Sequence, residues 1–174
     1  PIAGGAAIED PGELPKAAHE RSKKKEVRFA DPATGAPRLA KIEGRNVNIF
    51  DPVAGGEALV VLEGHTNDVR ALTFFEDPAT GGLRLASGSD DNSVRIWDLA
   101  AGGAALFVLE GHKGWVNALT AFADPATGET RLVSGSRDKT LRLWDASKEG
   151  AALRVVHFDD NVSALAVRSD TSGL

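Results

Sequence analysis

The sequence predicts an all-β fold made of repeated four-stranded antiparallel sheets. A Phe-Asp or Trp-Asp pair recurs every 47 residues, at 50–51, 97–98 and 144–145, and Gly-His recurs at the same interval, at 64–65 and 111–112. Most positions of residues 64–98 are identical to those of residues 111–145. These segments are therefore expected to be duplicated structural units.

The same turn sequence divides each unit. Asp-Pro-Ala-Thr-Gly occurs at residues 31–35, 77–81 and 124–128. Proline sets the φ angle of the second turn position, the aspartate side chain can bond the backbone ahead of it, and glycine accepts the left-handed conformation. Each copy predicts a hairpin turn between two strands.

Short β-rich runs lie between these turns. In the second unit they cover residues 69–75, 83–89, 94–98 and 104–109, and turn sequences separate them at hairpin distances. This predicts four strands in each unit, with neighbouring strands antiparallel. Because a small sheet that is apolar on both faces is not stable alone, we expect the units to pack side by side.

The ordered motifs of these units resemble the WD40 repeat family. In one unit Gly-His at 64–65 precedes Ser-Gly-Ser-Asp-Asp at 87–91 and Trp-Asp at 97–98; the next unit has Gly-His, Ser-Gly-Ser, Asp138 and Trp-Asp in the same order. The resemblance covers about residues 25–168 and implies WD40-type β-propeller blades of four antiparallel strands. It also implies a hydrogen-bonded chain inside each blade, formed by His65, Ser87, Asp91 and Trp97, and by His112, Ser134, Asp138 and Trp144.

Such a chain has a physical reason. A buried indole N–H, imidazole or carboxylate destabilises the fold unless it has a partner, and linking these groups fixes the loops at one end of the blade. Ser89 and Ser136 are the alternatives for the serine positions. In the first unit Lys41 replaces the serine and Phe50 the tryptophan, so no such chain is expected there.

The repeats divide the chain into five segments and predict an incomplete ring. We expect a remnant of a preceding repeat with a linker at 1–24, a degenerate blade 1 at 25–63, blade 2 at 64–110, blade 3 at 111–158 and the first strand of a further blade at 159–174. Propellers close with about four to eight blades, so three full blades plus edge strands do not close one. An open arc, an assembly of several copies and a longer parent chain all remain open; the lack of any methionine favours the longer chain.

The composition argues against several classes of function. A net charge of -5 gives no reason to expect binding to nucleic acid or to an anionic membrane. No apolar run approaches the roughly 18 residues of a membrane span, and the absence of cysteine favours an intracellular, cytoplasmic location. No metal, cofactor or catalytic site is expected, because the acidic pairs lack the ligand spacing of a calcium loop and the two Gly-His histidines are explained by the repeat.

We expect the chain to be a non-catalytic scaffold that binds a protein or peptide. Loops on a rigid scaffold often carry recognition, and the Gly-His turns share one end of the blades with residues 90–93 and 137–140, called here the loop face. The residues that follow Gly-His differ between the two units, whereas the residues of the expected hydrogen-bonded chain are identical in them. Such variation is expected for positions that shape a partner site. The partner-binding candidates are Asn67, Asp68, Arg70, Lys113, Trp115 and Asn117, followed by Asp160, Asn161 and Ser163. The alternative is a purely structural module that completes a ring within a longer chain or as a homo-oligomer.

Overall fold

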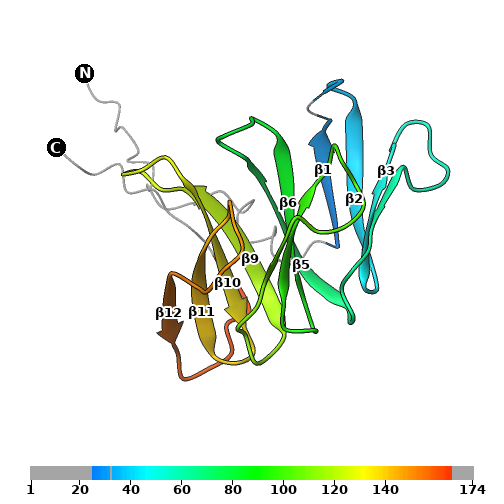
Figure 1. The fold of residues 1–174 in the computed structure, drawn as a ribbon. Helices are drawn as coiled ribbons and strands as arrows, with labels where there is room; N and C mark the ends of the chain where they lie inside the picture. Colours follow the sequence, from blue (N-terminus) through cyan, green and yellow to red (C-terminus); the bar gives the residue numbers. More distant parts are fainter. Residues whose placement is uncertain (1–24, 32, 166–174) are drawn as a thin grey trace, which may run out of the picture.

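The structure, a computed structural model, describes residues 25–31 and 33–165 as three four-stranded sheets that stand side by side (Figure 1). The predictions for residues 1–24 and 166–174 lie outside the described residues. The strands are β1 (Glu26–Ala30), β2 (Pro37–Glu43), β3 (Asn46–Phe50), β4 (Val60–Leu62), β5 (Val69–Glu76), β6 (Leu83–Ser89), β7 (Val94–Asp98), β8 (Phe107–Leu109), β9 (Val116–Ala123), β10 (Thr130–Ser136), β11 (Thr140–Asp145) and β12 (Arg154–His157).

The predicted all-β fold with four antiparallel strands in each unit is confirmed. The sheets have the orders β1-β2-β3-β4, β5-β6-β7-β8 and β9-β10-β11-β12, and every neighbouring pair is antiparallel. Over the described residues the sheets form an open arc, not a closed ring. None of the described segments is a helix that is long and apolar enough to cross a membrane.

The Asp-Pro-Ala-Thr-Gly sequences form the turns between the first two strands of each blade. In the second copy the Asp77 carboxylate accepts a hydrogen bond from the Ala79 amide at 3.0 Å, and the Gly81 amide donates to the Asp77 carbonyl at 2.7 Å. Gly81 has a φ of 68°, a left-handed value that favours glycine. The aspartate and glycine of this sequence therefore have the roles in the turn that the sequence predicted.

The outer strand of blade 2 is shorter than predicted. β8 begins at Phe107, whereas the apolar run suggested a strand from Ala104. Gly102 and Gly103 both have positive φ, so the chain is still turning there, and the first bond back to β7 is from the Leu106 amide to the Ile96 carbonyl. Apolar composition therefore marked the strand but not its first residue.

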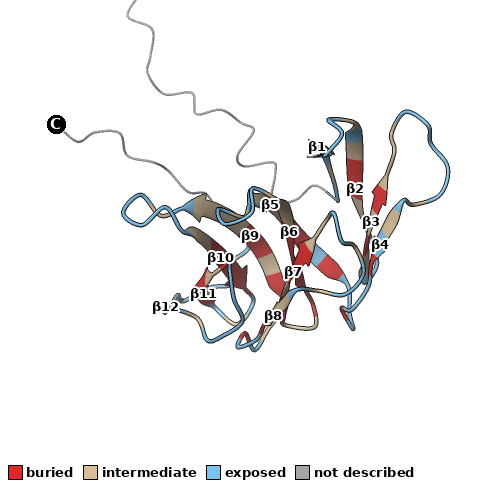
Figure 2. Ribbon diagram, turned by 45° about the horizontal axis from the view of Figure 1, so that its top comes forward, coloured by how far each residue is buried: buried red, intermediate tan, exposed pale blue. Residues whose placement is uncertain are grey.

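The hydrophobic core lies between the sheets, and Figure 2 shows buried residues where two sheets face each other. Blades 1 and 2 share one cluster that includes Val47, Ile49, Leu85 and Trp97. Blades 2 and 3 share the other, which includes Ile96 and Trp144 among its members. Each blade is therefore stabilised by its neighbours, as repeat architectures require.

Glycines in the second strand of blades 2 and 3 allow a neighbouring valine to pack directly against the sheet. A Cβ atom at Gly88 would lie 2.6 Å from Val116 Cγ1, where the first strand of blade 3 begins. At the equivalent Gly135 the overlap would be with Val162, and the Val162 amide donates to the Ser136 carbonyl at 3.0 Å. Val162 thus contacts blade 3 as Val116 contacts blade 2. Residues 159–165 contain no assigned strand, so the further blade predicted at 159–174 stays a prediction.

The two outermost sheet faces have unlike polarity. On the face of blade 1 that points away from blade 2, the strand pairing places Glu26 and Arg28 where blade 2 has Leu72 and Phe74. The face of blade 3 that points away from blade 2 is instead apolar, and its members include Ala118, Val133, Leu141, Leu143 and Val156. Blade 1 therefore carries charged side chains beside apolar ones such as Leu39 on its outer face, whereas the outer face of blade 3 is mostly apolar, with Arg154 opposite Leu143.

Candidate functional site

In blade 2 the structure brings together the four residues that the repeat pattern placed in one chain. His65 Nδ1 lies 2.8 Å from Asp91 Oδ2, and His65 Nε2 lies 2.7 Å from Ser87 Oγ. The Trp97 indole donates to Ser87 Oγ at 2.8 Å. His65, Ser87 and Trp97 are buried, so the four side chains run from the loop face into the core.

Blade 3 repeats this geometry 47 residues later. His112 Nδ1 lies 2.8 Å from Asp138 Oδ2, His112 Nε2 lies 2.7 Å from Ser134 Oγ, and the Trp144 indole donates to Ser134 at 2.8 Å. Because the carboxylate only accepts, the imidazole donates through Nδ1, and its Nε2 accepts from the serine hydroxyl. A neutral histidine therefore satisfies every member of the chain.

The ionisation of these groups agrees with that assignment. Burial lowers the pKa of His112 below its ordinary value, and this effect outweighs the nearby Asp138 carboxylate. Burial alone would raise the pKa of Asp138, but hydrogen bonds from Thr140, the Lys113 amide and His112 outweigh it and hold that pKa well below its usual range. The pair is therefore an ionised aspartate beside a neutral imidazole at neutral pH.

The structure adds residues that the sequence reasoning did not place. The Thr140 hydroxyl in blade 3 donates to Asp138 Oδ1 at 2.6 Å, and Ser93 does the same to Asp91 in blade 2 at 2.7 Å. The alternative serine of blade 2 makes different contacts, since Ser89 Oγ donates to the Asn67 carbonyl at 2.9 Å and accepts from the Asp91 amide at 3.1 Å. A hydroxyl two residues after the aspartate in both units was the signal available in the sequence.

Blade 1 has a different arrangement at these positions. Lys41 occupies the place of Ser87, and its Nζ lies 5.4 Å from the centre of the Phe50 ring, which occupies the place of Trp97. A cation over an aromatic face replaces the indole hydrogen bond. The substitutions that marked this blade as degenerate in the sequence thus compensate each other.

A second repeated arrangement lies at the opposite end of the blades, beside the hairpin turns. In blade 2 Arg84 bridges Asp77, at 3.1 Å, and Asp98, the aspartate of the Trp-Asp pair. Arg38 in blade 1 and Arg131 in blade 3 make the equivalent bridges. Sequence reasoning missed this clamp, although an arginine recurs in each unit between the two aspartates.

On the loop face, Trp115 is held between side chains of two blades. The Arg137 guanidinium lies 4.1 Å from the centre of the Trp115 ring, and the Arg70 guanidinium lies 5.3 Å from it. Arg70 is fixed by a bidentate pair with Asp90, at 2.9 and 2.5 Å. Trp115 keeps 36% of its surface exposed, so an aromatic side chain is presented to solvent on a fixed support.

The remaining candidates lie around this tryptophan and around a cavity near the first strands. Asn67, Asp68 and Lys113 are exposed, whereas Asn117 is half-buried. The cavity has a volume of about 310 Å³ and touches all three blades; its lining residues are Lys25, Ile42, Gly44, Asp68, Val69, Arg70, Asn117 and Ser163. Asp160 and Asn161 are exposed and do not line it.

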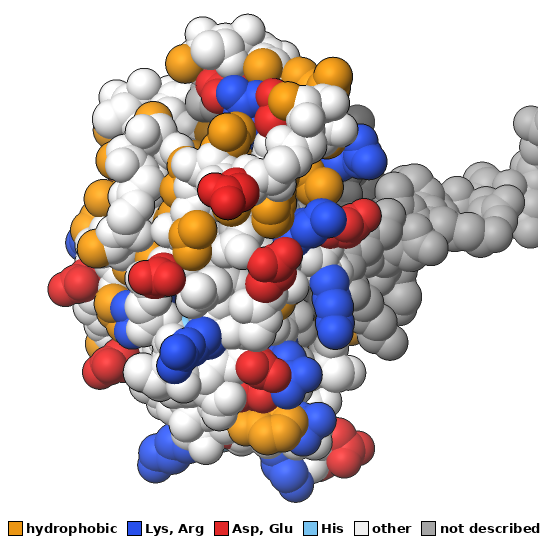
Figure 3. Space-filling view, turned by 90° about the vertical axis from the view of Figure 1, so that its right-hand side faces the viewer, with side chains coloured by type: hydrophobic (Ala, Val, Ile, Leu, Met, Phe, Trp, Pro, Cys, Tyr) orange, Lys and Arg blue, Asp and Glu red, His pale blue; other side chains and the backbone are white. Residues whose placement is uncertain are grey.

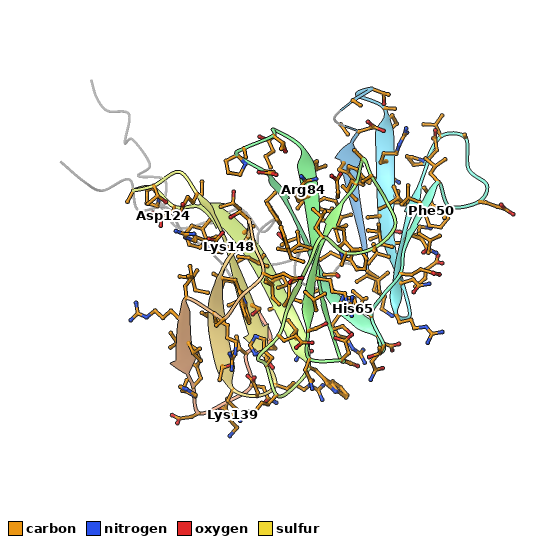
Figure 4. All side chains as sticks on the ribbon, viewed as in Figure 1. Phe50, His65, Arg84, Asp124, Lys139 and Lys148 are labelled. Atoms are coloured by element: carbon orange, nitrogen blue, oxygen red, sulfur yellow. The ribbon has the colours of Figure 1, made fainter. Side chains whose placement is uncertain are left out.

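The hydrogen-bonded histidine chain and the arginine clamp lie at opposite ends of the blades. Figure 4 places His65 and Lys139 at the lower end, whereas Arg84, Asp124 and Lys148 lie at the upper end. Among the described residues, no group of three or more His, Asp or Glu side chains is arranged to hold a metal ion. The loop face thus combines a supported aromatic side chain with an adjacent cavity.

Comparison with known families identifies the repeat. The family described as "WD domain, G-beta repeat" matches residues 56–98 and 103–145. This chain belongs to the WD40 repeat family. No curated protein matches the chain significantly.

The WD40 matches show how neighbouring blades are joined. The match to residues 56–98 starts before β4 of blade 1 and continues through β5, β6 and β7 of blade 2; the match to 103–145 does the same between blades 2 and 3. One sequence repeat therefore contributes strands to two sheets. WD40 repeats generally mediate protein–protein interaction and are typically non-catalytic scaffolds.

Proposed function

We propose that this chain is a non-catalytic scaffold that binds a protein or peptide segment across the loop face. The observation that carries the proposal is Trp115, a partly exposed indole stacked by Arg70 and Arg137. Large aromatic and arginine side chains on a rigid support contribute most of the binding energy at many interfaces. The neighbouring cavity, which Arg70 also lines, offers space for a side chain of the partner.

The rigidity of the face supports this proposal. The buried chain from His112 to Trp144 fixes the loop that precedes Trp115, and the Arg137 amide donates to the Trp115 carbonyl at 2.9 Å. A preorganised side chain loses little conformational entropy when a partner binds. The supported indole is therefore suited to binding a partner.

The test uses peptides selected from a random display library against the 174-residue chain. Their affinities are measured by calorimetry for the unaltered chain, for Trp115→Ala and for Leu106→Ala. Leu106 is 40% exposed on the outer edge of blade 2 and serves as the matched control. Loss of a central aromatic contact costs about 2 kcal/mol or more, so Trp115→Ala should weaken binding about thirtyfold while Leu106→Ala leaves it unchanged. Equal binding by all three proteins would reject the loop face as the site.

A further inference from the structure

Blades 2 and 3 carry different charges at equivalent loop positions. Blade 3 has Lys113, Arg137 and Lys139, and the positions 47 residues earlier in blade 2 are Thr66, Asp90 and Asn92. The hydrogen-bonded chain beneath these loops is the same in both blades. The cations are therefore not required by the fold, because blade 2 builds the same loops without them.

The three cations of blade 3 are available to a ligand. None of them forms an ion pair with another described residue, and all three are exposed. The nearest carboxylate in the sequence, Asp138, is already bonded to His112, Thr140 and the Lys113 amide. Their positive charge thus has no carboxylate partner among the described residues, in a protein whose net charge is -5.

Arg137 is arranged to bind a carboxylate. Its guanidinium stacks on the Trp115 ring at 4.1 Å, which orients the planar group and leaves N–H donors at its edge. Guanidinium groups bind carboxylates through two parallel hydrogen bonds, and such charge-assisted bonds are stronger than neutral ones. Figure 3 shows a hydrophobic side chain at the lower end of the molecule, the end that carries Lys139 in Figure 4, with Lys or Arg side chains and also Asp or Glu side chains beside it.

We propose that the segment bound at the loop face is an acidic peptide, whose carboxylates contact Lys113, Arg137 and Lys139 and whose apolar side chain packs on Trp115. This inference rests on the proposed function and adds the chemistry of the partner. Acidic groups elsewhere in the chain repel a long polyanion such as nucleic acid, whereas a short acidic segment contacts only the cationic blade 3 loops. The Phe158 amide donates to the Lys139 carbonyl at 2.9 Å, so the exposed Asp159 that follows lies next to this surface.

The experiment measures fluorescence anisotropy of three labelled octapeptides that share two leucines and differ only in having Glu, Gln or Lys at the other six positions. The protein is the 174-residue chain in low and moderate salt. We expect the Glu peptide to bind most tightly, the Gln peptide more weakly and the Lys peptide not measurably, with the Glu advantage falling as salt rises. A single-stranded oligonucleotide of similar charge is the fourth probe.

The variants replace blade 3 residues by those that blade 2 carries at the same positions. Lys113→Thr with Lys139→Asn should weaken the Glu peptide about fivefold and leave the Gln peptide unchanged. Lys139 has a φ of 65° and the equivalent Asn92 a φ of 70°, so asparagine suits this backbone. Lys148→Ala with Arg154→Ala removes two positive charges away from the loop face and should change neither affinity.

The outcomes separate this inference from the function on which it rests. If the Glu and Gln peptides bind equally, or if both double variants weaken the Glu peptide alike, the acidic partner is rejected. Library peptides that depend on Trp115 would still support the loop face in that case. Tighter binding of the oligonucleotide than of the Glu peptide would also overturn the inference, in favour of a nucleic acid ligand.

Discussion

Ser134→Ala tests whether the buried chain stabilises the blade. The Ser134 hydroxyl is fully buried, accepts from the Trp144 indole at 2.8 Å and donates to His112 Nε2 at 2.7 Å. Alanine leaves both of these groups without a partner in the core. Each unsatisfied buried group costs about 1–3 kcal/mol, so we expect a loss of about 3 kcal/mol in the free energy of unfolding.

The measurement is urea unfolding followed by tryptophan fluorescence and by circular dichroism, whose coincidence checks that the transition is two-state. The control is Ser147→Ala, which also removes a hydroxyl that donates to an aspartate, Asp145 at 2.6 Å, but at an exposed position. We expect the control to change stability by less than about 0.5 kcal/mol. A loss at Ser134 no larger than the loss at Ser147 would refute the role of the buried chain.

Three further predictions concern other features of the fold. Burial lowers the pKa of His112, so this side chain should stay neutral as pH falls below 6.5. The unfolded chain takes up the proton more readily, so the protein should be less stable at pH 5.5 than at pH 7.5. NMR titration of the His112 ring protons measures this pKa, and a value at or above 6.5 would contradict the assignment. Gly88→Ala should destabilise the protein by about 1–3 kcal/mol, because the added methyl group overlaps with Val116. In thermal unfolding, combining it with Val116→Ala should recover part of that loss. If the losses from the two substitutions simply add in the double variant, the overlap is excluded. Arg131→Ala should lower stability by about 1 kcal/mol at neutral pH and by less at pH 2, because its partner Asp145 loses its charge on acidification. Burial raises the pKa of Asp145, but hydrogen bonds from Ser147 and the charge of Lys148 outweigh burial and give this carboxyl a pKa of about 2. An equal loss of stability at both pH values would mean that the clamp is not electrostatic.

Much of the fold could be predicted because its signals are local. The turn at 77–81 and the strand at 94–98 depend on residues adjacent in sequence, and the 47-residue period extends each assignment to the next blade. Placing Ser87 with His65 and Trp97 required only the resemblance to a repeat with known order. The predicted start of β8 was wrong because the turn with its two glycines extends into the apolar run.

The support of Trp115 could not be predicted in the same way. Arg137 is 22 residues away in sequence, and Arg70 belongs to another blade. Their stacking depends on the register of β9 with β10 and on the packing of blade 2 against blade 3. The clamp at Arg84 likewise needs a hairpin and a third strand to bring its two aspartates together. Whether the loop face binds a partner stays a prediction.

The unlike polarity of the two outer sheet faces gives the array a direction. If blade 1 of a second copy covered blade 3 of the first, Glu26 and Arg28 would enter a surface made by Leu141 and Leu143. Burying charged groups against hydrocarbon is unfavourable unless they are paired and fully hydrogen-bonded. We therefore expect identical copies not to polymerise end to end. Any element that packs on the apolar face of blade 3 is therefore expected to present apolar side chains of its own.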